Sequence, residues 1–201
     1  MPDDIDPTTR KRADSARNER LLLDAAAAVF VESGVDAPVR EIAARAGVGI
    51  GTVYRHFPTR AELVIAVYRH QIEALEKSGA TLSSTSPTRY DALVGWVRGF
   101  VDFLATKHGL VAVMRDDSEG FNALHRLFLT RLEPVCADLV ARAVETREIR
   151  SDVGAYDLMR AVGNLCAGAR HDDRYRPELM VELLLTGLRV PLAHTKPSTN
   201  T

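Results

Sequence analysis

The sequence predicts an all-α protein of about nine helices. Apolar residues recur three and four positions apart through most of the 201-residue chain, which is the spacing of one helix face. No stretch shows the sustained alternation of apolar and polar residues that a half-buried strand needs. Glycine, proline or short polar runs separate the periodic segments. The expected helices are 18–33, 38–46, 50–56, 59–79, 88–106, 109–115, 119–147, 153–169 and 177–190.

The first four helices have ends that the sequence marks. Gly34 follows the first helix and Gly47 follows the second, and glycine is common just beyond a helix C-terminus because it adopts left-handed backbone angles easily. Thr59 and Glu62 have the spacing of a capping box, in which each side chain accepts a hydrogen bond from the other residue's backbone. They predict the start of the fourth helix, and Gly79 predicts its end.

The rest of the chain is divided by weaker signals. Residues 80–88 form a largely polar run that contains one proline, which predicts a surface connection. Pro134 falls inside the expected helix 119–147 and predicts a kink or a break there. Residues 1–17 and 192–201 are expected to form a mobile N-terminal arm and a mobile tail.

The composition is that of an ordinary globular protein, with 46% hydrophobic and 26% charged residues. The 26 lysines and arginines are matched by 27 acidic residues, so the formal net charge is −1. This balance excludes a protein that binds DNA through high positive charge alone. The basic surplus is local, because residues 10–70 contain ten bases and seven acids.

No feature of the sequence predicts a membrane span or export. The longest apolar run, Ala25–Val31, has seven residues, whereas a spanning helix needs roughly 18 or more. The N-terminus is acidic where a secretory signal is basic. Cys136 and Cys166 form no CxxC pair and suit a reducing compartment. We therefore expect a cytoplasmic protein with no membrane partner.

The segment Val39–Phe57 carries the main functional information. A helix, a tight turn at Gly47 and a second short helix are the parts of a helix-turn-helix, whose second helix enters the major groove of DNA. The residues that can lock the two helices together are Ile42, Ala43, Val48, Val53 and Phe57. The residues then left to face outward are Gly49, Ile50, Gly51, Thr52, Tyr54, Arg55 and His56.

The outward residues suit the chemistry of a DNA duplex. Thr52, Tyr54 and His56 can hydrogen-bond phosphate oxygens. Arg55 can reach a guanine edge, and Ile50 can pack on a thymine methyl. The two glycines allow the backbone to approach a phosphate closely. On spacing alone, a structural helical hairpin with the same surface residues explains the segment equally well.

The motif resembles one family, on the residues Ile42-Ala43, Ala46-Gly47-Val48 and Gly51-Thr52-Val53-Tyr54-Arg55-His56-Phe57. These residues resemble the TetR family of bacterial transcriptional regulators, and the resemblance covers about residues 18–75. It implies a three-helix DNA-binding domain at 18–79, a larger helical domain for ligand binding and dimerisation at 80–191, and usually repression that a small molecule relieves. The DNA-binding residues that we expect are Arg40, Gly49, Ile50, Gly51, Thr52, Tyr54, Arg55, His56 and Arg60, the last in place of the family's phosphate-contacting lysine.

Two positions depart from the family pattern. Pro38 stands where the family often has a threonine that caps the second helix and touches phosphate, and Asp36 is then the expected cap. Gly49 stands where a serine is common, so a backbone N–H would replace a side-chain contact. The basic run Arg10–Arg12 resembles the minor-groove arms of some members, and a solvated basic tail is the alternative.

The segments 153–169 and 177–190 have the features of a helix interface. The last of them is apolar nearly all round, so it must bury more than one side. The resemblance implies that both segments form the interface of a homodimer, whose two-fold axis would match a pseudo-palindromic operator in double-stranded DNA. Burial within one chain is the alternative.

Aromatic and sulfur-containing residues gather in the middle of the chain, and they predict a pocket for an apolar or aromatic small-molecule effector. An ordinary core would use the same residue types. The candidate ligand-binding residues are Trp96, Phe100, Phe103, Met114, Phe121, His125 and Phe128.

An enzyme and a helical protein-interaction module are the rival classes. The chain has no GxSxG, HExxH or P-loop motif, and Gly49-Ile50-Gly51 lacks the third glycine and the preceding strand of a dinucleotide site. We expect no cofactor and no metal, because a cation site at His171-Asp172-Asp173 is less convincing than an interhelical loop. An interaction module would explain the apolar helices but not residues 39–57. The expectation is a non-enzymatic regulator, located on the nucleoid when bound to DNA.

Overall fold

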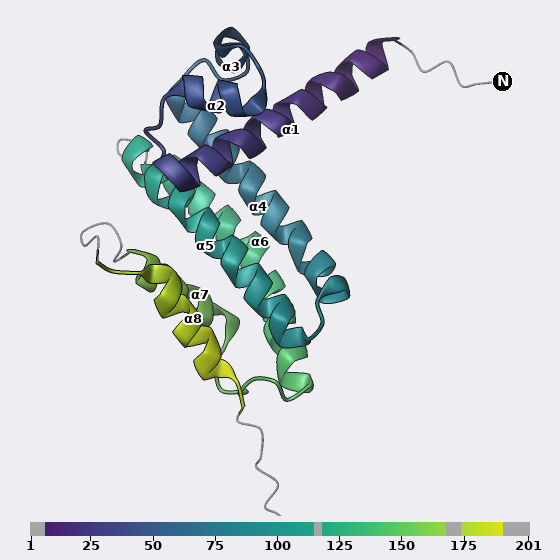
Figure 1. Ribbon diagram of the computed structural model, residues 1–201, viewed down its shortest axis with the longest axis vertical. Coiled ribbons are helices and arrows are strands. Elements are labelled where there is room, and N and C mark those ends of the chain that lie inside the picture. The colour runs from purple at the N-terminus through teal and green to yellow at the C-terminus, as the bar shows by residue number, and fades with distance from the viewer. Residues whose placement is uncertain (1–6, 115–117, 168–173, 191–201) are drawn as a thin grey trace, which may run out of the picture.

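The computed structural model describes residues 7–114, 118–167 and 174–190, and within these ranges it contains eight helices and no strand (Figure 1). The helices are α1 (Pro7–Ser33), α2 (Val39–Ala46), α3 (Ile50–His56), α4 (Arg60–Thr85), α5 (Arg89–Val113), α6 (Ser118–Glu145), α7 (Ala155–Ala167) and α8 (Pro177–Leu188). The predicted all-α class is confirmed. The expected tail 192–201 and the segment His171–Asp173 lie outside the described residues.

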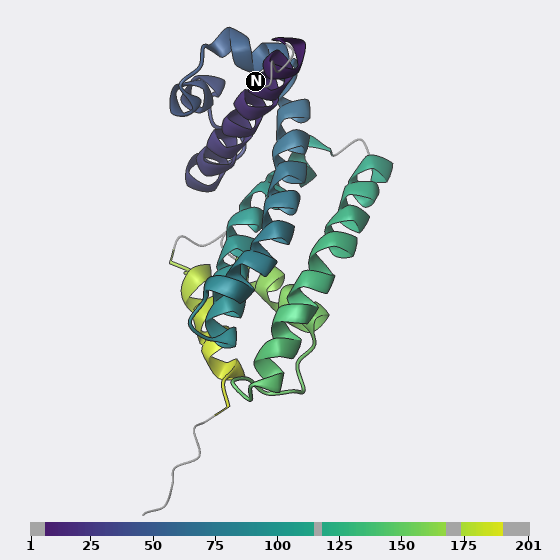
Figure 2. The ribbon, with the colours of Figure 1, turned by 90° about the vertical axis from the view of Figure 1, so that its right-hand side faces the viewer.

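The helices form two groups along the long axis of the molecule. Helices α1, α2 and α3 gather at one end, and α4 runs from that end along the body beside α5 and α6 (Figures 1 and 2). Helices α7 and α8 pack together against the part of the body that lies away from α3. Helix α4 is therefore the element that joins the two groups. No helix of the described ranges is long and apolar enough to cross a membrane.

The N-terminal group is built around two glycines with left-handed backbone angles. Gly34 has φ +79° after α1, and Gly47 has φ +68° after α2, as the sequence predicted. The small unit closes over a buried core to which α1, α2 and α3 each contribute, with Phe30, Ile42 and Val53. Tight turns and shared burial thus fix how α3 is presented.

Helix α1 begins at Pro7 rather than at residue 18. Residues 7–17, which the sequence suggested as part of an arm, therefore belong to a helix that projects beyond the bundle (Figure 1). No glycine or further proline lies between Pro7 and Ser33, so no residue there stops a helix locally. Arg10–Arg12 lie on this projecting part of α1.

The start of α2 differs from the expectation. Pro38 is its N-cap residue rather than part of its first turn, and no side chain of that residue caps the helix. The predicted capping role of Asp36 is wrong, because the first backbone bond of α2 runs from the N–H of Glu41 to the carbonyl of Pro38 itself, over 2.9 Å. Proline at this position presets the backbone angle and needs no donor.

Helix α4 begins as predicted and ends later than predicted. Its capping box is present, with the N–H of Glu62 donating to Thr59 Oγ1 and the N–H of Thr59 donating to Glu62. Gly79 does not end the helix but lies buried inside it, because a Cβ there would come within 2.3 Å of the Val135 side chain of α6. This glycine permits close contact between two helices.

The polar run that follows Gly79 is largely helical, and the connection shrinks to residues 86–88. The hydroxyls of Ser84 and Thr85 donate to the carbonyl of Thr81, over 2.8 and 2.9 Å, so they satisfy the helix instead of ending it. Leu82 packs against Gly95 of α5. Tertiary packing therefore overrides the weak helix preference of the run.

The body contains fewer breaks than expected. Helix α5 spans both expected helices 88–106 and 109–115, so eight helices replace the expected nine among the described residues. Its buried face continues through Leu104 and Leu110, and that burial outweighs the roughly 1 kcal/mol that the intervening glycine costs. Helix α6 runs without a break through Pro134.

The C-terminal end is held by a short backbone bridge. Ile149, in the turn after α6, pairs with Arg189, the residue after α8. The N–H of Arg150 donates to the carbonyl of Leu188 over 2.9 Å, and the N–H of Val190 donates to Glu148 over 3.1 Å. The end of α8 is thereby fixed to the end of α6.

Candidate nucleic-acid interface and internal cavities

The segment Val39–Phe57 has the geometry of a helix-turn-helix. Helix α2 ends at Gly47, and the N–H of Val48 donates to the carbonyl of Ala43 over 3.0 Å, which tightens the turn. The predicted locking residues face inward: Val48 is half-buried and packs on the core, and the buried ones are Ile42, Ala43, Val53 and Phe57. The prediction of which residues hold α2 and α3 together is confirmed.

The predicted outward residues lie at the surface of α3 and its N-terminus. Tyr54 is 51% exposed and Ile50 is 48% exposed, high fractions for large apolar or aromatic side chains. Gly49, Gly51 and Arg55 are also exposed, whereas Thr52 and His56 are half-buried. Arg40 is exposed on α2. The open face of α3 thus combines apolar, hydroxyl-bearing and basic groups.

Arg60 is turned toward the protein rather than toward solvent. Its guanidinium donates to the carbonyls of Val35 and Ala37, with 2.7 Å to the latter, and lies 5.1 Å from the centre of the Phe30 ring. Burial lowers the pKa of Arg60, while the nearby Asp36 and Tyr54 raise it. The arginine therefore ties the start of α4 to the connection between α1 and α2. The sequence did not indicate this role.

A second pair fixes α2 against α1. Arg45 donates two hydrogen bonds to the carboxylate of Glu32, each 2.6 Å long. The bidentate geometry orients the pair, although both groups are exposed and the energy of such pairs is small. Sequence reasoning missed the pair because the two residues lie 13 positions apart.

A cavity of about 250 Å³ lies between α5, α6 and α7 and is open along α7, where the lining residues Tyr156, Arg160 and Asn164 are exposed. We call it the Lys107 cavity. Its lining consists of Phe100, Leu104, Lys107, His125, Phe128, Leu129, Tyr156, Met159, Arg160, Gly163, Asn164 and Ala167. Three of the seven candidate ligand-binding residues line it: Phe100, His125 and Phe128.

The other four candidates lie outside the lining of this cavity. Trp96 is buried and stacks on Phe100, with ring centres 5.6 Å apart. Phe103 is buried beside Phe128, at 5.6 Å between ring centres, and Phe121 stacks on the imidazole of His125 at 6.5 Å. Met114 is buried just after α5. Trp96, Phe103 and Phe121 therefore belong to the aromatic cluster behind the cavity wall. Met114, at the end of α5, is not part of that cluster.

The polar groups of the Lys107 cavity are positively charged or neutral. Burial, and then the charge of Arg160, lower the pKa of Lys107 to about 8. Burial, followed by the charges of Lys107 and Arg160, also lowers the pKa of His125. The sequence analysis missed the lysine and the arginine because each stands alone in the sequence, on a different helix.

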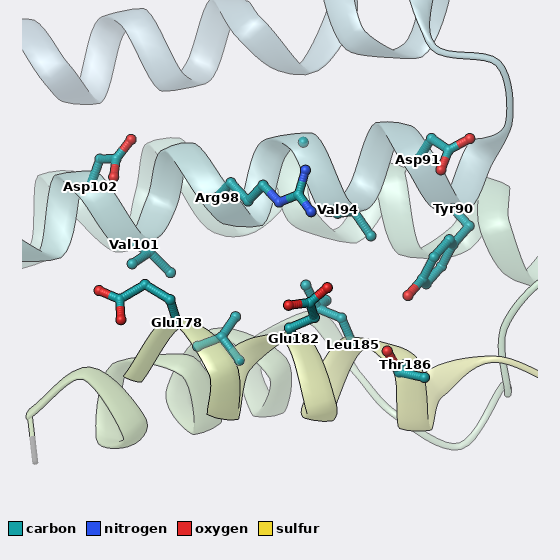
Figure 3. Close-up of a pocket in the computed structure, with 12 residues that line it drawn as sticks. Tyr90, Asp91, Val94, Arg98, Val101, Asp102, Glu178, Glu182, Leu185 and Thr186 are labelled. Atoms are coloured by element: carbon teal, nitrogen blue, oxygen red, sulfur yellow. The ribbon is translucent and has the colours of Figure 1, made fainter. Parts of the chain in front are cut away.

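A larger cavity of about 570 Å³ opens between α5 and α8, and we call it the α5–α8 cavity. Figure 3 shows Glu178 and Glu182 on α8 directed toward α5, which carries Arg98 and Asp102. Burial, and then the charge of Glu178, raise the pKa of Asp102. The two cavities therefore differ in the sign of their charge.

Comparison with known proteins places these features in a family. A family model described as "Bacterial regulatory proteins, tetR family" matches residues 22–67. A second, described as "Transcriptional regulator SbtR-like, C-terminal domain", matches residues 89–190, which is just over half of the 201-residue chain. The chain belongs to the TetR family. It is a DNA-binding transcriptional regulator, with an N-terminal helix-turn-helix domain and a helical C-terminal domain.

This TetR-family chain is similar to known members over most of its length. It is 26% identical over 184 residues to the HTH-type transcriptional repressor KstR2 of Mycolicibacterium smegmatis, covering 91% of this chain and 78% of that protein. The crystal structure of the TetR transcriptional regulator SCO0520 from Streptomyces coelicolor is 33% identical, with a TM-score of 0.69 over 87% of this chain and 99% of that one. A TetR protein from Mycobacterium vanbaalenii is 31% identical, with a TM-score of 0.63 over 89% and 99% of the two chains.

The last helix of this TetR-family chain carries an apolar stripe that is exposed in part within the described residues. On α8, Val181, Leu185 and Leu188 are buried against the body. Away from this face lies Leu183, which is 58% exposed, with half-buried Met180 beside it, while half-buried Leu184 packs on the core. The expected helix 153–169 is described as α7 over Ala155–Ala167.

Proposed function

We propose that this TetR-family protein is a homodimeric repressor that leaves a pseudo-palindromic operator when a small molecule occupies the Lys107 cavity. The observation that carries the proposal is the position of two features along α4. The exposed face of α3 lies at the N-terminal end of α4, and the Lys107 cavity lies between helices of the body along which α4 runs. Repression is the activity named for KstR2, to which this chain is similar. The protein would act without enzymatic activity, in the bacterial cytoplasm.

The face of α3 supplies the proposed contacts with DNA. Tyr54, Thr52 and His56 would hydrogen-bond phosphate oxygens, and the exposed N-terminus of α3 at Gly49 and Gly51 would offer backbone N–H groups. Ile50 and Arg55 would meet base edges in the major groove, and Arg40 would contact the phosphates beside it. Arg60 would act mainly by holding the connection between α1 and α2 in place, since its guanidinium is already engaged.

The stripe on α8 supports the proposed dimer. Leu183 is 58% exposed beside half-buried Met180, and in the proposed dimer a helix of the partner would cover both. Helices α7 and α8 of two chains would form the interface. A two-fold axis through it would present two copies of α3 to operator half-sites about one helical turn apart, near 34–36 Å.

The effector is proposed to act through α4. This helix begins beside α3 with the capping box at Thr59 and continues along α5 and α6, whose side chains form the cavity wall. A molecule that moves α5 or α6 would tilt α4 and change the separation of the two α3 helices in the dimer. The geometry needed for both half-sites would then be lost.

The experiment is a DNA-binding measurement with fragments selected from the source genome. Tyr54→Ala should lower operator affinity by about tenfold or more, because each phosphate or base contact is worth roughly 1–3 kcal/mol. Leu21→Ala is the matched control, since Leu21 is 52% exposed on α1, outside α3, the Lys107 cavity and the proposed dimer interface. Affinity for the operator should also fall steeply as salt rises. If Tyr54→Ala and Leu21→Ala bound the operator equally well, α3 would not be the DNA-reading helix.

A further inference from the structure

We propose that the effector of the Lys107 cavity is a small organic monocarboxylate with a flat apolar or aromatic body. The inference rests on the proposed function, because it assumes that this cavity is the effector site. It adds the chemical class, which follows from the charges, the unpaired polar atoms and the shape of the cavity.

The cavity gathers cations without a counter-ion. The cations are Lys107 from α5 and Arg160 from α7, and they line the same space as the imidazole of His125 from α6. None of the twelve lining residues is an aspartate or a glutamate. Burial, and then the charge of Arg160, lower the pKa of Lys107. A partly buried Lys107 with the exposed Arg160 beside it, both positively charged, favours a ligand of the opposite sign.

The polar groups of the cavity lack partners within the described part of the chain. The Lys107 ammonium group lies 4.0 Å from the centre of the Phe128 ring and has no ion pair there. The Nδ1 atom of His125 is buried and has no hydrogen-bond partner. A partly buried charge without a counter-ion is costly to a fold, and a bound carboxylate would pair with the Lys107 ammonium group.

The walls of the cavity suit a flat and compact body. The rings of Phe100 and Phe128 stack within 9° of parallel, with centres 5.9 Å apart, and His125 stacks on Phe128 at 5.6 Å. The volume of about 250 Å³ lies just below the range of roughly 300–1,000 Å³ that is usual for drug-sized ligands. A molecule with one ring or a short acyl chain would therefore be of the right size.

The α5–α8 cavity is the natural internal comparison. Its lining includes Asp91, Asp102, Glu178 and Glu182 against a single cation, Arg98. An anion would be repelled there and attracted to the Lys107 cavity. The charges of the lining residues thus decide which of the two cavities an anionic ligand enters.

The test measures binding to the full-length protein without DNA, at pH 7, by thermal shift and calorimetry. The probes are benzoate, phenylacetate and hexanoate, each paired with its uncharged amide, and sodium chloride at equal ionic strength is the blank. At least one acid should raise the melting temperature with rising concentration, and its amide should bind at least about tenfold more weakly. Lys107→Met should lower the affinity for that acid by a similar factor. Arg98→Met, in the α5–α8 cavity, should leave it unchanged.

Three results would overturn the carboxylate assignment. These are binding of no acid in the panel, equal binding of an acid and its amide, or full retention of acid binding by Lys107→Met. Operator binding is measured separately with the same probes. An acid that binds through Lys107 but leaves operator affinity unchanged would support the anion site and reject the effector role. A neutral compound that releases the operator from this cavity would support the effector role and reject the anion.

Discussion

The indole Nε1 of Trp96 donates a hydrogen bond to the backbone carbonyl of Leu75 over 3.1 Å, and this bond joins α5 to α4. Trp96 is fully buried and stacks on Phe100, a residue of the Lys107 cavity wall. The cavity wall, the indole and the connecting helix are therefore in direct contact. The Trp96 side chain therefore links Phe100 directly to α4.

Replacing Trp96 with phenylalanine removes this bond and part of the ring volume. The expected loss in the free energy of unfolding is about 2–4 kcal/mol, from the lost hydrogen bond and the small cavity left behind. Tyr68→Phe is the control, because its hydroxyl lies 3.5 Å from the carbonyl of Leu124, at the limit of a hydrogen bond, and should cost less. Denaturant unfolding of both variants measures the difference. Equal losses would show that the Trp96 bond adds nothing to the contact between α4 and α5.

Arg60 provides a second prediction, because its guanidinium is bound to the protein. Arg60→Met should lower the free energy of unfolding by about 2–3 kcal/mol, since it removes charge-assisted bonds to the carbonyls of Val35 and Ala37. Arg40→Met is the control, as Arg40 is exposed on the neighbouring helix. Circular dichroism during urea unfolding gives both values. If Arg60→Met kept full stability but lost operator binding, the arginine would instead act chiefly as a phosphate ligand.

Lys107 should make both stability and anion binding depend on pH. Its pKa in the folded protein is about 8, below the ordinary value of 10.5, so the unfolded chain holds more protons between these values. The destabilising effect of Lys107 is fully present below pH 8 and fades as the pH rises toward 10.5. Lys107→Met should therefore be more stable than the wild type at pH 7, and the gap should narrow by pH 9.

The titration of Lys107 also predicts how the affinity for a carboxylate changes with pH. A carboxylate favours the protonated lysine, so its affinity should fall as the pH rises above 8, whereas the Lys107→Met variant should show no such step. The other charged or titratable groups lining the cavity are His125, Tyr156 and Arg160, and burial, followed by the charges of Lys107 and Arg160, lowers the pKa of His125. Calorimetry at pH 7 and pH 9 measures the change. A flat affinity profile for the wild type would count against contact between the ligand and Lys107.

The apolar stripe on α8 gives a prediction for assembly. Leu183→Glu would place a charge in the proposed interface and should shift the protein from dimer to monomer at micromolar concentration. Leu21→Glu is the matched control, because Leu21 is 52% exposed on α1 and Leu183 is 58% exposed. Sedimentation velocity reads out the mass of each variant. A dimer that survives the charge at Leu183 would place the interface elsewhere.

The N-terminal unit was predictable from sequence because its signals are local. Gly34, Gly47 and the pair Thr59–Glu62 each act on residues within one turn, and the structure contains the turns and the capping box that they indicate. The locking residues of the helix-turn-helix were also correct, since burial there follows a short helical period. The bidentate contact between Arg45 and Glu32 was not predictable, because no periodicity joins residues on separate helices.

The body was harder to predict because tertiary contacts override local preferences. Gly79 carries the same chemical signal as Gly47, but its neighbour Val135 on α6 decides that it lies inside a helix. The cavity illustrates the same limit. Aromatic spacing on α5 and α6 identified Phe100 and Phe128. Lys107 and Arg160 could not be identified in this way, because they come to line one cavity only when α7 packs against α5.

The close approach of Gly79 to Val135 has a mechanical consequence. Because a Cβ at Gly79 would clash with Val135, the two helices touch backbone to side chain there, and α4 has a fulcrum at that point. The arm from Gly79 to Arg60 at the start of α4 is about 28 Å long, at 1.5 Å per residue. A tilt of about 10° around this fulcrum moves the far end of the arm by about 5 Å. A displacement too small to disturb the packing around Gly79 is thereby amplified at the end of the helix that carries α3.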